Sequence, residues 1–225
     1  MLVSEFRARW PKVGQSPLHS YDIRNSTKGF SWLTQISASE RARFMADLSQ
    51  TITGLPIHAL ACVVDRDGYN RRYLDQYGAD RWKLCKTAFS ILLERAVKFA
   101  QHFDAKLRVY VERSDKRTDA QMKGYYDELK VRGLPFDGQR SAQYSPLGAD
   151  DFKSVLYEFR LKDKQSELMQ VADLLLWPLC RNGYALEEKS YNALKESGRL
   201  VEHLCSSSNK LQGTKYSCFE AVVKK

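Results

Sequence analysis

Cysteine is scarce in this sequence, and its spacing argues against two common ways of stabilising a fold. The chain of 225 residues contains five cysteines, an odd number, and no Cys-x-x-Cys pair. The four histidines are scattered and show no zinc-type pairing. A disulfide framework and a zinc cluster are therefore not expected, and the cysteine usage favours a reducing compartment.

Long hydrophobic runs are also missing. No apolar stretch reaches the ~18 residues that a membrane-spanning helix requires, and the N-terminal residues lack the apolar core of a secretion signal. Glycine-rich phosphate loops, dinucleotide fingerprints and Ser-His-Asp motifs are absent as well, which argues against nucleotide-hydrolysing motors and dehydrogenases. We therefore expect a cytoplasmic protein without a membrane partner.

The rest of the composition is that of an ordinary globular protein. Hydrophobic residues make up 43% of the chain and charged residues 28%. Both fractions lie near the averages of globular proteins, so neither disorder nor a membrane protein is indicated. The length favours one domain. We predict a single α/β domain over residues 1–225, with its core at about 15–185 and a C-terminal helix and tail at 186–225.

Positive charge is in excess, with a formal net charge of +9. A basic balance of this size favours polyanionic partners, above all nucleic acid. In the densest basic zone, cations alternate with tyrosine and tryptophan, a mixture that suits phosphates and stacked bases. The nucleic-acid-binding candidates in this zone are Arg66, Arg71, Arg72, Lys83 and Lys86. An ordinary loop followed by an amphipathic helix remains the alternative interpretation.

Helix and strand patterns alternate along most of the chain. A capping box, Ser37-Ala38-Ser39-Glu40, predicts the start of a helix that Gly54 ends. Apolar periodicity predicts a helix at about 80–103, and further helices are expected at 118–132, 168–177 and 187–204. Strands are predicted at 57–64, 107–112 and 155–161. In residues 1–36 only a short extended piece around Leu18–Ile23 is predicted. This alternation is typical of an α/β fold.

The strands at 57–64 and 107–112 are expected to be parallel neighbours, because the helix between them is long enough for a crossover. Asp65 and Glu112 would then both lie at the carboxyl ends of strands, where open sheets bind ligands. Asp65 also belongs to an Asp-Arg-Asp-Gly sequence that is ordinary turn chemistry.

Asp173 is the most informative carboxylate, because it interrupts the apolar run Leu168–Trp177. As a helix that run would be buried on nearly every side, and a buried acid requires a partner. Glu112, at the end of its own apolar strand, is the second acid that a cation would require. Alternatively, Asp173 pairs with an arginine or caps a backbone group.

The order of these motifs resembles a known family. His19-Ser20-Tyr21-Asp22-Ile23 precedes the capped helix, Glu112 ends a strand, and Gln170-Val171-Ala172-Asp173-Leu174 lies on the penultimate helix. This order resembles the prokaryotic family called domain of unknown function 3800, over roughly residues 15–185. The Gln-x-Ala-Asp-Leu box is its most specific part. The resemblance implies a ribonuclease H-like mixed sheet flanked by helices, and a nuclease.

The resemblance also implies a site. Ribonuclease H-type nucleases hold two divalent cations about 4 Å apart on carboxylates, so Mg²⁺ or Mn²⁺ would be the cofactor. It assigns the roles of metal ligand and catalytic residue to Glu112 and Asp173. Auxiliary candidates, each with an ordinary turn, helix-start or loop alternative, are His19, Asp22, Asp65, Asp115 and Asp119.

One family motif is not found. Members usually open with a strand carrying an Asp-Glu-Ser motif, whereas the only acids in residues 1–36 are Glu5 and Asp22. The first strands of the fold are therefore expected to be missing, and the nuclease activity to be weak or absent. The alternatives are a non-catalytic module that binds nucleic acid or protein, and a hydrolase in which Glu112 and Asp173 act as an acid/base pair without metal.

Overall fold

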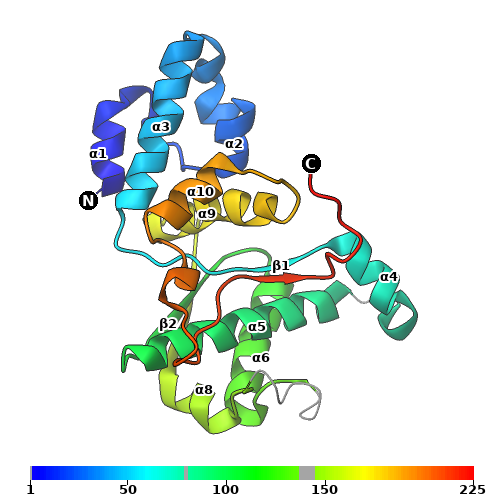
Figure 1. Ribbon diagram of the computed structural model, residues 1–225. Helices are drawn as coiled ribbons and strands as arrows, with labels where there is room; N and C mark the ends of the chain where they lie inside the picture. Colours follow the sequence, from blue (N-terminus) through cyan, green and yellow to red (C-terminus); the bar gives the residue numbers. More distant parts are fainter. Residues whose placement is uncertain (1, 79–80, 137–144) are drawn as a thin grey trace. The chain divides into compact units, whose positions relative to one another are not determined.

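A computed structural model describes residues 2–78, 81–136 and 145–225 of the chain. The described residues form a mostly helical, mixed α/β protein with two small parallel sheets (Figure 1). They divide into two compact units, each built from two separate stretches of chain: 1–59 with 163–199, and 60–162 with 200–225. The prediction of a single domain is not tested by this division and stays a prediction.

The first unit is helical. Its elements are α1 (Leu2–Arg9), η1 (Pro11–Val13), α2 (Ser20–Asn25), η2 (Lys28–Thr34), α3 (Ala38–Gly54), α9 (Glu167–Asn182) and α10 (Lys189–Glu196). Ser37 accepts a hydrogen bond from the Glu40 backbone N–H at 3.1 Å, so the predicted start of α3 is confirmed. α3 packs against α1 and α10.

Aromatic side chains fill the core of the first unit. Phe44 of α3 lies 5.4 Å from Phe6, 5.1 Å from Trp10 and 5.4 Å from Trp32, measured between ring centroids. Edge-to-face pairs such as Trp10–Phe44 are the arrangement that ring quadrupoles favour. The extended piece expected at Leu18–Ile23 is wrong, because Ser20 to Asn25 form α2.

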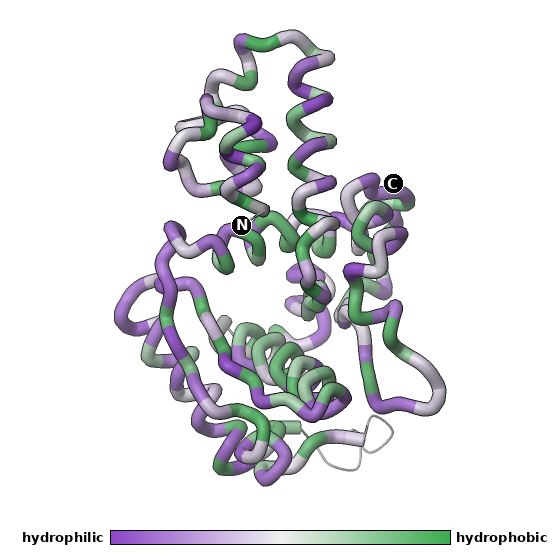
Figure 2. The backbone as a smooth tube through the Cα atoms, turned by 90° about the vertical axis from the view of Figure 1, so that its left-hand side faces the viewer, coloured by the Kyte–Doolittle hydropathy of each residue, from purple (hydrophilic) through white to green (hydrophobic). Residues whose placement is uncertain are grey.

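The second unit contains the strands. Its elements are β1 (Cys62–Val64), α4 (Arg66–Tyr77), α5 (Arg81–His102), β2 (Leu107–Glu112), α6 (Lys116–Arg132), α8 (Ala149–Val155), β3 (Leu156–Lys162), η4 (Val201–Leu204) and β4 (Lys215–Ser217). In Figure 2, hydrophilic and hydrophobic residues alternate along the helices, as amphipathic packing requires. α5, α6, β2, α8 and β3 share one hydrophobic core.

The sheets differ from the predicted arrangement. β1 pairs in parallel with β4, and β2 pairs in parallel with β3, so the two strands expected to be neighbours do not pair with each other. The general α/β prediction is confirmed, but no mixed sheet of the ribonuclease H type is evident among the described residues. The physical reason is local: β1 is only three residues long, and its backbone partner comes from the C-terminal tail.

Three further predicted elements are corrected. The sequence after Asp65 forms helix α4 rather than a turn. The helix expected at 187–204 divides into α10 and η4, with Gly198 between them at φ +67°. α9 is not buried all round, since Leu168 and Leu176 are 56% and 53% exposed.

Within the described ranges, no helix is both long and apolar enough to cross a membrane.

Candidate functional site

Helix α9 carries the Gln-x-Ala-Asp-Leu box, and the two polar residues of the box contact the same short segment of chain. Gln170 and Asp173 are three residues apart, so their side chains share a face of the helix. Gln170 is buried, and its Oε1 accepts hydrogen bonds from the Leu18 backbone N–H and from Arg7, both at 3.0 Å. Its Nε2 donates to two carbonyls. Gln170 therefore anchors the segment that begins at Leu18.

Asp173 holds the same segment two residues further on. Its Oδ2 accepts a hydrogen bond from the Ser20 backbone N–H at 2.6 Å. Ser20 is the first residue of α2, and the preceding His19 makes no side-chain cap. Asp173 thus satisfies a helix N–H that lacks a partner within α2. This is the backbone-capping role that the sequence analysis leaves open. The side chain is 23% exposed, so part of it reaches solvent.

His19 lies between two carboxylates. Its Nδ1 is 3.1 Å from Asp22 Oδ2, and its Nε2 is 3.7 Å from Asp173 Oδ1. In a neutral imidazole whose Nδ1–H donates to Asp22, Nε2 is an acceptor. In that tautomer, Nε2 and Asp173 Oδ1, which lie 3.7 Å apart, present two acceptors to a proton donor.

Asp22 is an ionised anchor for the imidazole. Burial raises the pKa of its carboxyl group, but hydrogen bonds from Lys28, His19 and Thr27 outweigh burial and hold that pKa below its ordinary value. Thr27 Oγ1 donates at 3.1 Å and Lys28 Nζ at 3.2 Å. With its oxygens occupied in this way, Asp22 orients His19 and is not a free ligand. His19, Asp22 and Asp173 are called the His19 cluster below.

The His19 cluster does not by itself fit the predicted pair of cations. Mg²⁺ takes oxygen ligands, usually one or two carboxylates together with water and substrate phosphates. Asp22 is committed to other partners, which leaves Asp173 and the nitrogen of His19. Among the residues that the structure describes, no group of three or more His, Cys, Asp or Glu side chains is placed to hold a metal ion.

Glu112 belongs to the second unit. It is the last residue of β2, half-buried, and it lies opposite Lys162 of β3 in a parallel register. It therefore ends a strand, as predicted. The prediction that its carboxylate and that of Asp173 share one site is not tested, and it stays a prediction.

The other predicted acids start helices or loops of the second unit. Asp115 accepts hydrogen bonds from the backbone N–H groups of Arg117 and Thr118, and the Thr118 side chain is the first cause of its lowered pKa. Asp119 accepts from the Ser114 N–H. Asp65 caps α4 through the Gly68 N–H at 2.6 Å. These roles match the helix-start alternatives rather than ligand roles.

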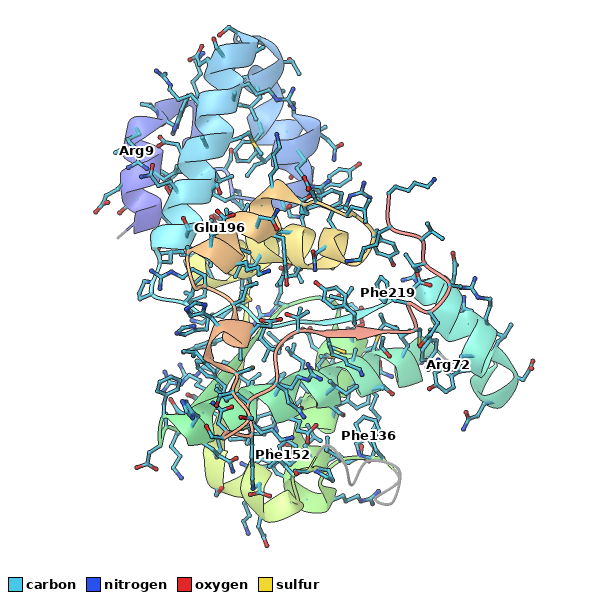
Figure 3. All side chains as sticks on the ribbon, viewed as in Figure 1. Arg9, Arg72, Phe136, Phe152, Glu196 and Phe219 are labelled. Atoms are coloured by element: carbon cyan, nitrogen blue, oxygen red, sulfur yellow. The ribbon has the colours of Figure 1, made fainter. Side chains whose placement is uncertain are left out.

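Most of the predicted nucleic-acid contacts already have carboxylate partners. Arg72 lies 2.7 Å from Glu220, Lys86 lies 2.7 Å from Glu128, and Arg71 reaches Asp65 at 4.0 Å. Figure 3 shows Arg72 on α4 with Phe219 of the C-terminal segment close to it. Arg66 is exposed at the start of α4, and the side chain of Lys83 lies outside the described residues.

Two residues that contact the His19 segment were not assigned these contacts from the sequence. Gln170 was part of the box but was not expected to bind the backbone. A buried amide needs hydrogen-bond partners, so its position three residues before Asp173 could have indicated this contact. Ser20 contributes through its backbone N–H, which no side-chain pattern reveals. Residues in both segments were therefore named from the sequence, and the main-chain contacts between them were missed.

The fold and the site define a mixed α/β protein in which a box on α9 holds a His-Asp segment. Comparison with known proteins adds one relative, the uncharacterized protein y4pM of Sinorhizobium fredii (strain NBRC 101917 / NGR234). It is 33% identical over 204 residues, which cover 90% of this chain and 74% of y4pM. The chain belongs to the same family as y4pM. No family model and no solved structure matches the chain.

Proposed function

We propose that this protein is a nuclease that hydrolyses phosphodiester bonds of nucleic acid, with the His19 cluster as its acid–base centre. The observation that carries the proposal is the contact between the two motifs of the resemblance in the first unit. Gln170 and Asp173 bind the backbone N–H groups of Leu18 and Ser20, the residues that precede and follow His19 in the chain. The resemblance to domain of unknown function 3800 adds a ribonuclease H-like relationship and a requirement for Mg²⁺ or Mn²⁺.

The chemistry of the cluster suits proton removal from water. His19 Nε2 accepts a proton from a water molecule as the water oxygen attacks phosphorus, and Asp22 stabilises the imidazolium that forms. The bond from phosphorus to the leaving oxygen then breaks, that oxygen takes a proton from solvent water, and the His19 imidazolium returns its proton to solvent. Asp173 places a negative charge beside His19 Nε2, where the water proton is accepted. A divalent cation would stabilise charge on the phosphate, but the described ligands do not place it, so no step is assigned to it.

Cleavage assays with His19 variants test the proposal. The protein is incubated with labelled RNA, single-stranded DNA and duplex DNA, in Mg²⁺, in Mn²⁺ and in chelator. We expect slow cleavage that requires the cation, and a decrease of about 10²–10⁴-fold in His19→Gln. His102→Gln, a change at an exposed histidine of α5, is the matched control. Cleavage by His19→Gln at the rate of the control would refute the acid–base role.

A non-catalytic role is the second candidate. It is favoured by the contact of Asp173 with the Ser20 N–H, because a helix-capping carboxylate needs no further function. In that case the protein binds nucleic acid through its basic residues and does not cleave it. A gel shift that weakens with salt and persists in chelator, without any cleavage in either cation, would support this candidate over the nuclease.

A further inference from the structure

A mostly apolar pocket lies within the first unit, next to the His19 cluster. It measures about 130 Å³ and is formed by α2, α3, α9 and α10. Its apolar walls come from Met45, Leu48, Ile52, Leu174, Pro178 and Leu194. An apolar cavity of about 150 Å³ in another protein binds one benzene ring, whereas pockets for drug-sized ligands are about 300–1,000 Å³. The pocket therefore has room for one ring system and not for a whole nucleotide.

The pocket and the His19 cluster share residues. Ser20 lines the pocket, and its backbone N–H donates to Asp173. Leu174 lines the pocket, and it directly follows Asp173 in α9. The pocket is therefore linked to the His19 cluster through Ser20, which lines the one and binds the other.

A flat cation forms part of the pocket wall. The Arg24 guanidinium carbon lies 3.4 Å from the centroid of the Trp177 ring, and both residues line the pocket. Arg24 Nε donates to Ser20 Oγ at 3.4 Å. Among the described residues of this unit, Arg24 forms no ion pair with an acidic side chain. Its positive charge is thus available to an anionic ligand, and stacked guanidinium and aromatic planes are surfaces on which unpaired bases stack.

We propose that this pocket receives one unstacked base of a single-stranded nucleic acid, with Arg24 beside the attached phosphate. The inference rests on the proposed nuclease function and names its substrate class as single-stranded. Apolar walls around one ring, a stacked Arg–Trp pair and a shared residue with the His19 cluster together match such a base. The pocket recognises the ring by shape and stacking, so little preference among pyrimidines is expected.

Binding in chelator tests the inference separately from cleavage. The probes are a short fluorescein-labelled oligothymidylate and an abasic strand of equal length. We expect the base-containing strand to bind about tenfold more tightly than the abasic strand. Ser190→Trp, a change at an exposed residue of the pocket rim, should abolish that difference. Ser39→Trp, an exposed serine of α3 away from the pocket, should preserve it.

The outcomes distinguish the two proposals. Equal binding of both strands, or equal effects of Ser190→Trp and Ser39→Trp, overturns the base pocket and leaves the nuclease proposal standing. A base preference in a protein without cleavage supports the pocket alone. If Ser190→Trp does not fold, Trp177→Ala replaces it, because this change removes the aromatic ring of the pocket, and loss of the base preference is again expected. If Ser190→Trp weakened the binding of a leucine-rich peptide but not that of the oligothymidylate, the base pocket would be overturned and the pocket assigned to a protein partner.

Discussion

At the scale of single residues, the polar side chains that hold the His19 segment are paired. Gln170 makes four hydrogen bonds, and Asp22 is held by Thr27, Lys28 and His19. A buried polar group that loses its partner costs more than a hydrogen bond contributes. The geometry of His19 therefore depends on residues that do not themselves take part in chemistry.

Gln170→Leu should destabilise the protein. The change leaves the buried Leu18 N–H without an acceptor and removes a partner of Arg7. We expect the free energy of unfolding to fall by about 1–3 kcal/mol in urea titrations. Gln50→Leu, at an exposed position of α3, is the control and should change it by less than about 0.5 kcal/mol. Equal effects of the two variants would contradict the anchoring role of Gln170.

Asp22 should make stability depend on pH in the acid range. Its pKa is lower in the folded than in the unfolded protein, where the pKa is about 3.9. The stabilisation is therefore present above the unfolded pKa and is lost as the pH falls through the lower, folded pKa. We expect Asp22→Asn to be less stable than the wild type at pH 7, with the difference shrinking towards pH 3. Thermal unfolding across this range checks it. A difference that grew on acidification would contradict the sign.

At the scale of elements, sequence signals worked where they were local. The Ser37 capping box gave the start of α3, the long apolar periodicity gave α5, and Gly133 marked the end of α6. α1 and α2 were missed because they are short and their apolar residues complete a shared core instead of an amphipathic stripe. β4 was missed because its only strand signal is parallel pairing with β1.

The candidate site shows the same division. Asp173 was chosen because it interrupts an apolar run, and His19 through the resemblance. Their proximity in the first unit was not foreseen. Asp65 and Asp115 were chosen for their positions near strand ends, and both cap helices. An acid after a strand can cap the next helix or bind a ligand, and both roles use the same residue types at the same positions. Only the hydrogen bonds in the structure distinguish the two roles.

Gly68 of α4 should tolerate no side chain. A Cβ at this position would lie 1.9 Å from the carbonyl oxygen of Cys218, which follows β4. Gly68→Ala should therefore lower the free energy of unfolding by about 1–3 kcal/mol, as overpacking does. Gly124→Ala is the matched control, because a Cβ there meets nothing within 4 Å. In the middle of α6 it should stabilise the protein by about 0.5–1 kcal/mol. If Gly68→Ala were as stable as Gly124→Ala, the close approach to Cys218 would be wrong.

At the scale of the whole molecule, the net charge of +9 favours nucleic acid, but it overstates the number of available contacts. Arg72 and Lys86 are each within 2.7 Å of a glutamate. A paired cation releases fewer counterions on binding a phosphate, because it must also leave its carboxylate. The net charge is thus expected to attract nucleic acid in a general way, while only a few unpaired cations contribute most of the phosphate contacts.

Exposed Arg66 should contribute more to nucleic-acid binding than Arg72. We expect Arg66→Gln to reduce the slope of log affinity against log salt by about 0.7–0.9, the value for one phosphate contact. Arg72→Gln should change that slope by less, because Glu220 already neutralises this arginine. Fluorescence anisotropy over a salt series measures both. A larger change with Arg72→Gln would show that its ion pair does not persist in the complex.

The most direct measurement is the cleavage rate of Asp173→Asn relative to wild type, taken together with its melting temperature. Asparagine keeps an oxygen for the Ser20 N–H but removes the negative charge beside His19. We predict that cleavage of single-stranded nucleic acid falls at least tenfold while the melting temperature changes little. Glu167→Gln, an exposed acid of the same helix, should leave both unchanged. Cleavage by Asp173→Asn at the wild-type rate would contradict the assignment of the His19 cluster as the catalytic centre.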